Sequence, residues 1–319
     1  MVDDADFVYL ATDPDREGEA IAWSLRKFLK IPKSKYQRIT FHEITQEAIN
    51  KALANPRDID EYLVDAAHSR GILDKIIGYR LSPIARKQVY VFLNDVKLYA
   101  KSVGRCQSAG LKLICNRERE IQSFVPETYY DLYLLFNKDK QDFKAKYVGT
   151  KDKEVKRISS KDEMLSIVND CKKGNYSIID TITKERISNP KPPFTTSTFQ
   201  QEVSSKLGIG VKDAMNAAQR LFEGIDLGGQ HKALITYIRT DDTSMSPEFQ
   251  ETLKAFVIDN YGKTYYSPLK EAKKSENSQE GHECLRTIDL EMTPEKLSKY
   301  INDRTLIKVY DIIYKRTIA

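Results

Sequence analysis

The apolar positions of residues 6–53 follow two different periods, and together they predict a layer of strands and helices. "DFVYLAT" (6–12) is typical of a buried strand, and "YQRITF" (36–41) of a second one. Residues 17–29 carry apolar side chains at the spacing of a helix with one buried face, and "TQEAINKAL" (45–53) predicts another helix. Strands and helices that alternate in this order favour an α/β layer with parallel strands.

The pattern changes twice in the middle of the chain. From about 58 to 121 it is helical. Beyond 128 the chain is rich in tyrosine and isoleucine with partial alternation, which predicts antiparallel strands joined by charged turns. The predicted strands are 129–137, 142–149 and 176–188, and the turns are 138–141 and 150–163. "NPKPPF" (189–194) carries three prolines and is typical of a domain boundary.

The part that follows this boundary is again mostly helical. Residues 197–206 and 211–223 predict helices, and "KALITYIRTDD" (232–242) predicts an extended segment. The polar stretch 267–281 is typical of a mobile loop, and "TLIKVYDIIYKR" (305–316) predicts a last helix.

Composition excludes some classes of protein but does not choose among the rest. The 319 residues are enough for two or three domains, and no apolar run approaches the ~20 residues of a membrane helix. Four scattered cysteines without a C-x-x-C pair argue against a zinc site or a disulfide framework and predict a reducing, cytoplasmic location. The net charge of +5 favours an anionic partner only weakly.

An acidic cluster, "DPDRE", stands between the first predicted strand and helix. Ligands of an open parallel sheet bind beyond the carboxyl ends of its strands, and in an extended loop Asp13, Asp15 and Glu17 point the same way. Carboxylates so close repel one another unless a cation neutralises them, and Mg²⁺ suits such a site. The alternative is purely structural: Asp15 caps the helix, while Glu17 and Glu19 favour its positive end.

The second chemical signal is the segment "LITYIRTDD". If it is extended, Tyr237, Arg239 and Asp241 lie on one side. A cation two residues from a phenol favours the phenolate and binds a phosphate oxygen, which makes Tyr237 a candidate nucleophile on phosphorus. The alternative is that Tyr237, one of 18 tyrosines, only packs or meets solvent.

Both segments resemble one family. "LATDPDREGEAIAW" is similar to the D-x-D-x-E segment of the Toprim domain in type IA DNA topoisomerases, and "PPFTTSTFQQEVSSKLGIGVKDAMNAAQRLFEG" with "LITYIRTD" resembles their active-site domain. The resemblance implies that Tyr237 attacks one DNA strand, that Arg239 positions the scissile phosphate and that Asp241 is a supporting acid. It also implies a catalytic role for Glu17 and Mg²⁺ as the cofactor of the acidic cluster.

Three further segments resemble the same family, and they supply most of the predicted DNA contacts. "SRGILDKIIGYRLSP", "SVGRCQSAGLKLICNRERE" and "GHECLRT" each match a family stretch, with Gly71 standing where the family has a second arginine. The DNA-binding residues that the resemblance implies are Arg16, Arg70, Asp74, Arg105, Gln107, Asp241, His282 and Arg286.

The resemblance implies a multidomain protein of mixed α+β and α/β class whose parts form a ring. Its expected divisions are a partial Toprim domain (1–57), a partial helical base domain (58–121), the first part of a β-rich arch (122–190), the active-site tyrosine domain (191–287) and a returning part of the arch (288–319). The implied reaction is ATP-independent cleavage of one strand through a 5′-phosphotyrosine link, strand passage and resealing. Its partner is DNA, single-stranded or negatively supercoiled, and the expected protein is a cytoplasmic, nucleoid-associated monomer with no contact to a membrane.

The chain also departs from the family. Nothing like the family's "VESP-x-K" stretch precedes Asp3, and the chain stops at "YKRTIA", so the sequence predicts an internal fragment or an incomplete gene product. Two other functions therefore stay open. One is a Toprim nuclease or primase that works without Tyr237, and the other is a truncated relative that binds single strands and does no chemistry.

Overall fold

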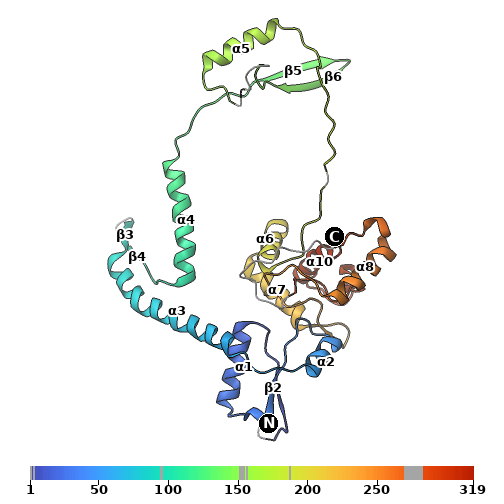
Figure 1. Cartoon of the computed structure of the whole chain (residues 1–319). Coiled ribbons are helices and arrows are strands. Elements are labelled where there is room, and N and C mark those ends of the chain that lie inside the picture. Colours follow the sequence, from blue (N-terminus) through green and yellow to red (C-terminus); the bar gives the residue numbers. More distant parts are fainter. Residues whose placement is uncertain are drawn as a thin grey trace. The chain divides into compact units, whose positions relative to one another are not determined.

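The computed structural model describes residues 2, 4–93, 96–150, 155, 157–186, 188–268 and 283–319. The chain divides into two compact units (Figure 1). The first unit comprises Met1–Lys75 and Ser188–Ala319, and the second comprises Ile76–Ile187. Each unit is described by itself below.

The N-terminal part of the first unit is the predicted strand and helix layer. Strand β1 (Val8–Leu10) pairs in parallel with β2 (Tyr36–Arg38), so the prediction of parallel strands is confirmed. Helix α1 (Arg16–Phe28) connects them through the short 3₁₀ helix η1 (Lys33–Lys35), and α2 (Gln46–Ala54) follows β2. The small apolar core of this layer contains Leu10, Ala22, Ile31, Tyr36, Ile59 and Val64.

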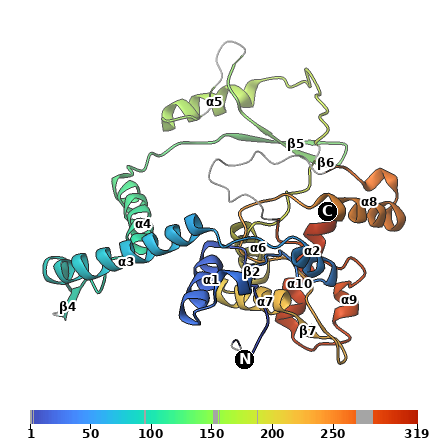
Figure 2. The same ribbon diagram turned by 60° about the horizontal axis from the view of Figure 1, so that its bottom comes forward.

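The largest apolar core of the described chain lies in the C-terminal part of the first unit. Helices α6 (Thr196–Leu207), α7 (Val211–Glu223) and α10 (Arg304–Ile318) enclose it, and Figure 2 shows the three gathered together. Their local sequence explains their limits: Thr195 and Thr198 form a capping box at the start of α6, and Gly208 ends it in the left-handed region at φ 65°. Around this core lie β7 (Ile225–Asp226), β8 (His231–Lys232), α8 (Pro247–Tyr261), the 3₁₀ helix η2 (Lys263–Tyr265) and α9 (Pro294–Leu297).

A buried carboxylate ties α6 to α10. Glu202 is 9% exposed and accepts hydrogen bonds from Lys191, Lys206 and Arg316. Burial alone raises the pKa of Glu202, but the hydrogen bonds from Lys206, Arg316 and Lys191 outweigh it and lower the pKa to about 2. The carboxylate is therefore charged at neutral pH, and its contact with Arg316 joins the last turn of α10 to α6.

The second unit contains local pairs of elements. Helix α3 (Glu61–Gln88) begins in the first unit and ends in the second, where the antiparallel hairpin β3 (Tyr90–Leu93) and β4 (Val96–Tyr99) follows it. Helix α4 (Arg105–Ser123) leads to a second hairpin, β5 (Tyr133–Lys138) and β6 (Gln141–Lys146), which confirms two of the predicted strands. Helix α5 (Lys161–Lys173) completes the unit.

Several expectations for the elements were wrong or incomplete. The segment 58–121 is not purely helical, because β3 and β4 interrupt it. The predicted turn 150–163 contains the start of α5, and the predicted strand 176–188 forms no strand in its described residues, 176–186 and 188. Helix α8 had not been predicted. The predicted loop 267–281 lies outside the described residues from 269 onward.

Candidate active site

The acidic segment forms the turn between β1 and α1. Asp15 is the N-cap of α1, and its Oδ1 accepts a hydrogen bond of 2.7 Å from the amide of Gly18. Thr12 Oγ1 donates to the Gly18 carbonyl at 2.6 Å. A Cβ at Gly18 would lie 2.1 Å from the Asp13 carbonyl oxygen, so only glycine allows this close approach. The capping alternative is thus confirmed for Asp15, but it uses only one of the two carboxylate oxygens.

Arg38, which was not singled out in the sequence, binds the backbone of this turn. The Arg38 side chain is fully buried, and its Nη2 donates to the Asp13 carbonyl at 2.7 Å. Its Nη1 donates to the carbonyls of Leu10 and Ile39 at 2.9 and 2.6 Å. One guanidinium therefore joins the end of β1, the end of β2 and the acidic turn.

The charge of Arg38 is balanced by Glu19, which is also buried. Arg38 Nε lies 3.1 Å from Glu19 Oε2, and Arg57 donates to both Glu19 oxygens at 2.8 Å. The amide of Asp60 adds a further bond of 2.7 Å. Burial raises the pKa of Glu19, but the hydrogen bonds from Arg57 and Asp60 and the two positive charges lower it overall. Glu19 is thus a structural anion, not part of the exposed acidic cluster.

The tyrosine segment meets the acidic turn directly. The Tyr237 hydroxyl donates to Asp15 Oδ2 at 2.9 Å, although the two residues are 222 positions apart. Arg239 Nη1 lies 3.4 Å from the same oxygen. Tyr237 is only 3% exposed, and its ring packs edge-on against Phe222 with 5.4 Å between the centroids. A phenol, a carboxylate and a guanidinium therefore converge on one point.

The backbone of this segment is fixed from both sides. The Tyr237 amide donates to the His42 carbonyl at 2.7 Å, and the Thr236 amide donates to the Arg286 carbonyl at 3.0 Å. Residues 234, 235 and 236 are all at most 1% exposed. The segment forms an isolated bridge at Ile235 and bends at Ile238, so it is not extended throughout as expected. Residues 233–238 are all buried and do not alternate between core and solvent.

The electrostatics of the phenol differ from the expectation drawn from the sequence. Burial raises the pKa of Tyr237, and the nearby charge and hydrogen bond of Asp15 raise it further, while Arg239 only partly opposes this. Arg239 thus favours the phenolate as expected, but burial and Asp15 outweigh it, so the pKa of Tyr237 is raised overall in the protein without DNA. The pKa of Asp13 is likewise raised, first by partial burial and then by the charge of Asp15.

The third predicted metal ligand faces elsewhere. Glu17 Oε1 lies 3.6 Å from Arg70 Nη1, and both side chains are about half exposed. Among the described residues, no three histidine, cysteine or acidic side chains lie together in a way that could hold a metal ion. Asp13 and Asp15 are the two acidic residues left at this turn, and two carboxylates are a common number for Mg²⁺ that also binds substrate phosphate.

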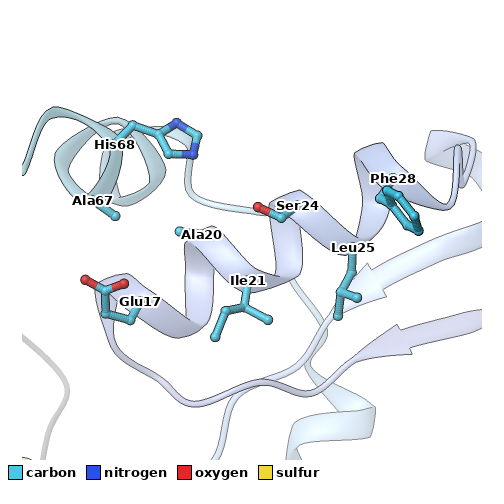
Figure 3. Close-up of a pocket in the computed structure, with 8 residues that line it drawn as sticks. All are labelled: Glu17, Ala20, Ile21, Ser24, Leu25, Phe28, Ala67 and His68. Carbon is cyan, nitrogen blue, oxygen red and sulfur yellow. The ribbon is translucent and has the colours of Figure 1, made fainter. Parts of the chain in front are cut away.

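A shallow groove begins at Glu17 and follows the outer face of α1 (Figure 3). Its far wall comes from the first half of α3, and its lining is mostly apolar. The lining residues are Glu17, Ala20, Ile21, Ser24, Leu25, Phe28, Ala67 and His68. The groove thus connects the acidic end of α1 with a strongly exposed aromatic side chain, Phe28, which is 84% exposed.

The predicted DNA contacts fall into three groups. Arg16, Arg70, Asp74 and Asp241 are exposed in the first unit. In the second unit Arg105 is the first residue of α4 and half-buried, and Gln107 is exposed with its amide on Ser102 Oγ at 3.2 Å. His282 lies outside the described residues.

Arg286 forms a group of its own, because it is 2% exposed. Its Nη2 contacts Glu283 at 2.6 Å and Glu43 at 3.0 Å, so its positive charge is already paired inside the protein. This burial does not support the predicted contact between Arg286 and DNA.

Comparison with known proteins decides the family. A family model described as DNA topoisomerase matches residues 58–319, which is most of the chain. The chain belongs to the DNA topoisomerase family. A Toprim domain model matches residues 1–44, in agreement with the topoisomerase segment predicted around Asp13 and Asp15.

Two relatives place the chain within topoisomerases of type I. DNA topoisomerase 1 of Campylobacter jejuni is 40% identical over 319 residues, which cover 99% of this chain and 44% of that protein. The structure of full-length topoisomerase I from Thermotoga maritima matches with a TM-score of 0.72 and 36% identity, covering 97% of this chain and 47% of that one. The chain thus spans less than half the length of these topoisomerases.

These matches confirm the resemblance to type IA topoisomerases and the multidomain class of mixed helices and strands. They do not test the five domain boundaries or the role of any single residue, which stay predictions. In the described part of the chain, no helix has both the length and the apolar character required to cross a bilayer.

Proposed function

We propose that this chain provides the strand-cleaving centre of a type IA DNA topoisomerase, with Tyr237 as the nucleophile. The supporting observation is the hydrogen bond of 2.9 Å between the Tyr237 hydroxyl and Asp15, which joins the two segments that the family uses for chemistry. Because the chain spans less than half of its relatives, strand passage and relaxation of negatively supercoiled DNA are part of this proposal.

Cleavage follows from the positions of three side chains. The Tyr237 oxygen attacks a phosphodiester phosphorus, and the bond to the 3′ oxygen breaks. The leaving 3′ oxygen takes a proton from solvent, so a 5′-phosphotyrosine link and a free 3′-hydroxyl result. Oδ2 of Asp15 already accepts the hydrogen bond of the phenol, so it is placed to receive its proton. Arg239, with its side chain 60% exposed, is available to stabilise charge on the phosphate. The phosphotyrosine link conserves the bond energy, so resealing reverses the attack and requires no ATP.

Mg²⁺ is the proposed cofactor, and Asp13 and Asp15 are the residues that would hold it. Burial raises the pKa of Asp13 and the charge of Asp15 raises it further, which supports a cation at this turn. When bound, the ion would neutralise these carboxylates and contact phosphate oxygens. Glu17 would join them only after leaving Arg70, from which it is 3.6 Å away.

The proposed partner is DNA with single-stranded character, as expected for underwound duplexes. Arg16, Arg70, Asp74 and Asp241 are exposed in the first unit, and Arg105 and Gln107 of α4 in the second unit belong to the same proposal. Phosphate contacts by such arginines provide affinity without base specificity. His282 belongs to the same proposal, as do a monomeric state and a cytoplasmic, nucleoid-associated location.

A covalent-adduct assay tests this function. The full chain is incubated with Mg²⁺ and a single-stranded oligonucleotide labelled at its 3′ end, since that fragment stays on the tyrosine, and the mixture is denatured before electrophoresis. Tyr237→Phe should abolish the adduct and leave oligonucleotide binding unchanged. Tyr310→Phe is the matched control, because Tyr310 is equally buried but lies on α10. Full cleavage by Tyr237→Phe would instead support the nuclease alternative. If the unmodified chain binds the oligonucleotide but forms no adduct, the binding module would be supported.

A further inference from the structure

Arg286 occupies an unusual position between two chain segments that are distant in sequence. Its guanidinium contacts Glu283, three residues away, and Glu43, which is 243 residues away in the segment after β2. The same group lies 3.7 Å from the ring centroid of Phe249, so one face of the cation is covered by an aromatic ring. Nη1 donates to the Thr287 carbonyl at 3.1 Å.

These contacts surround the backbone of the proposed nucleophile. The Arg286 amide donates to Thr236 Oγ1 at 2.9 Å, and the Arg286 carbonyl accepts from the Thr236 amide at 3.0 Å. The next residue, Tyr237, donates its amide to the carbonyl of His42, which directly precedes Glu43. Two connections therefore link Arg286 to residues 42 and 43. One is the ion pair between the side chains of Arg286 and Glu43, and the other runs along the backbone through Thr236 and Tyr237 to His42.

We propose that Arg286 and Glu43 form a clasp that positions Tyr237 against the acidic turn and whose opening lets the two segments separate. The pairing of Arg286 with Glu43 fixes residues 41–45 relative to the segment 283–287, and Tyr237 lies between them. Arg286 is thus a positioning residue. The consequence for DNA cleavage depends on the proposed function, whereas the clasp itself does not.

The distribution of charge explains how such a clasp opens at low cost. Arg286 has two carboxylate partners, and only Glu43 lies on the far side of the contact. When Glu43 leaves, Glu283 remains at 2.6 Å and keeps the buried guanidinium paired. Glu43, with its side chain 26% exposed, is close enough to water to be solvated after release. Neither charge is then left buried and alone, which is the main penalty for breaking an internal ion pair.

Hydrogen exchange of the Tyr237 amide tests the clasp without DNA, since this amide bonds across the contact to His42. In the full chain, Glu43→Gln should accelerate its exchange roughly tenfold, because a charged hydrogen bond becomes a neutral one. Glu283→Gln is the matched control: it removes a carboxylate from the same guanidinium without touching the far side, so exchange at Tyr237 should stay within about twofold. Amides of α6 report whether either variant loosens the whole unit.

The outcomes separate clearly. Equal exchange in Glu43→Gln and the unmodified chain, or equal acceleration by both variants, would overturn the clasp. Faster exchange in Glu43→Gln alone, with Glu43→Asp partly restoring protection, would support it. In the adduct assay Glu43→Gln should slow adduct formation about tenfold while oligonucleotide affinity is unchanged. If the unmodified chain forms no adduct, the proposed function fails, and the exchange contrast still decides the clasp.

Discussion

Replacing Arg38 by methionine should unfold the strand and helix layer before the rest of the protein. Methionine fills a similar volume but donates no hydrogen bonds. The substitution removes the donor from the carbonyls of Asp13 and Ile39, and it leaves Glu19, whose side chain is 1% exposed, without one of its two cations. The Leu10 carbonyl is less affected, because it also accepts from the Ile39 amide at 3.1 Å.

The expected loss is large relative to the stability of a domain. Removing one partner of a buried ion pair typically costs about 3–5 kcal/mol. The Arg57 contacts to Glu19 reduce this penalty, while the two orphaned carbonyls add about 1–3 kcal/mol each if no water reaches them. A net loss of about 4 kcal/mol is a substantial part of the 5–15 kcal/mol that stabilises a typical domain.

Urea denaturation followed by tryptophan fluorescence measures this effect locally. Trp23 is the only tryptophan of the chain, and it lies in α1 with its ring 4.9 Å from that of His68. With a urea dependence of about 2 kcal/mol/M, Arg38→Met should lower the midpoint of the Trp23 transition by about 2 M.

Arg57→Met is the control for this experiment, because the Arg57 side chain is 38% exposed and water can replace it at Glu19. Its midpoint should fall by no more than about 0.5 M. Equal shifts for Arg38→Met and Arg57→Met, or an unchanged midpoint for the former, would show that the buried guanidinium does not stabilise this layer.

Two further changes test the acidic turn and the pair of helices α6 and α10. Gly18→Ala must displace the Asp13 backbone, so it should lower the free energy of unfolding by about 2 kcal/mol and reduce adduct formation at least tenfold. In α3 the added Cβ of Gly71→Ala meets no atom within 4 Å, so this control should stabilise the chain by up to ~1 kcal/mol in the same melting experiment. Glu202→Gln should lower the free energy of unfolding by about 2 kcal/mol at pH 7, after allowance for the exposed lysine partners of Glu202. Because the pKa of Glu202 is lowered, its stabilising contribution is present above pH ~4.5 and disappears as the pH falls toward 2. Denaturation curves of the variant and the unmodified chain should therefore converge near pH 2. A constant difference between them down to pH 2 would contradict the assigned pKa.

The sequence predicted the parts of the fold that depend on local periodicity. Helices α1, α6, α7 and α10 lie within a few residues of their expected positions, because each has a regular apolar face and recognisable end signals. Helix α5 was missed although Ser160 caps it, since charged residues at its start were interpreted as a turn. Residues 176–186 show the reverse error: β-branched residues alone do not make a strand without a partner to pair with.

The candidate site divides in the same way. Asp13, Asp15 and Tyr237 were identified from short motifs, and the structure brings Tyr237 and Asp15 together. Their supports were not predicted: Arg38 was not singled out, and Arg286 was expected to contact DNA, because both act through burial and through carbonyls that no sequence pattern marks. The sequence does not distinguish an exposed arginine from a buried one, so the role of Arg286 could be inferred only from its contacts with Glu43 and Glu283 in the structure.

The two oxygens of Asp15 have separate obligations, since one accepts the Gly18 amide and the other accepts the Tyr237 hydroxyl. Because both oxygens accept a hydrogen bond, few other side chains can replace aspartate at position 15. Glutamate would overshoot both donors by a methylene, and asparagine would keep the helix start but turn an amino group toward the phenol. We therefore expect fewer substitutions among related sequences at residue 15 than at Asp13, whose carboxylate does not cap a helix.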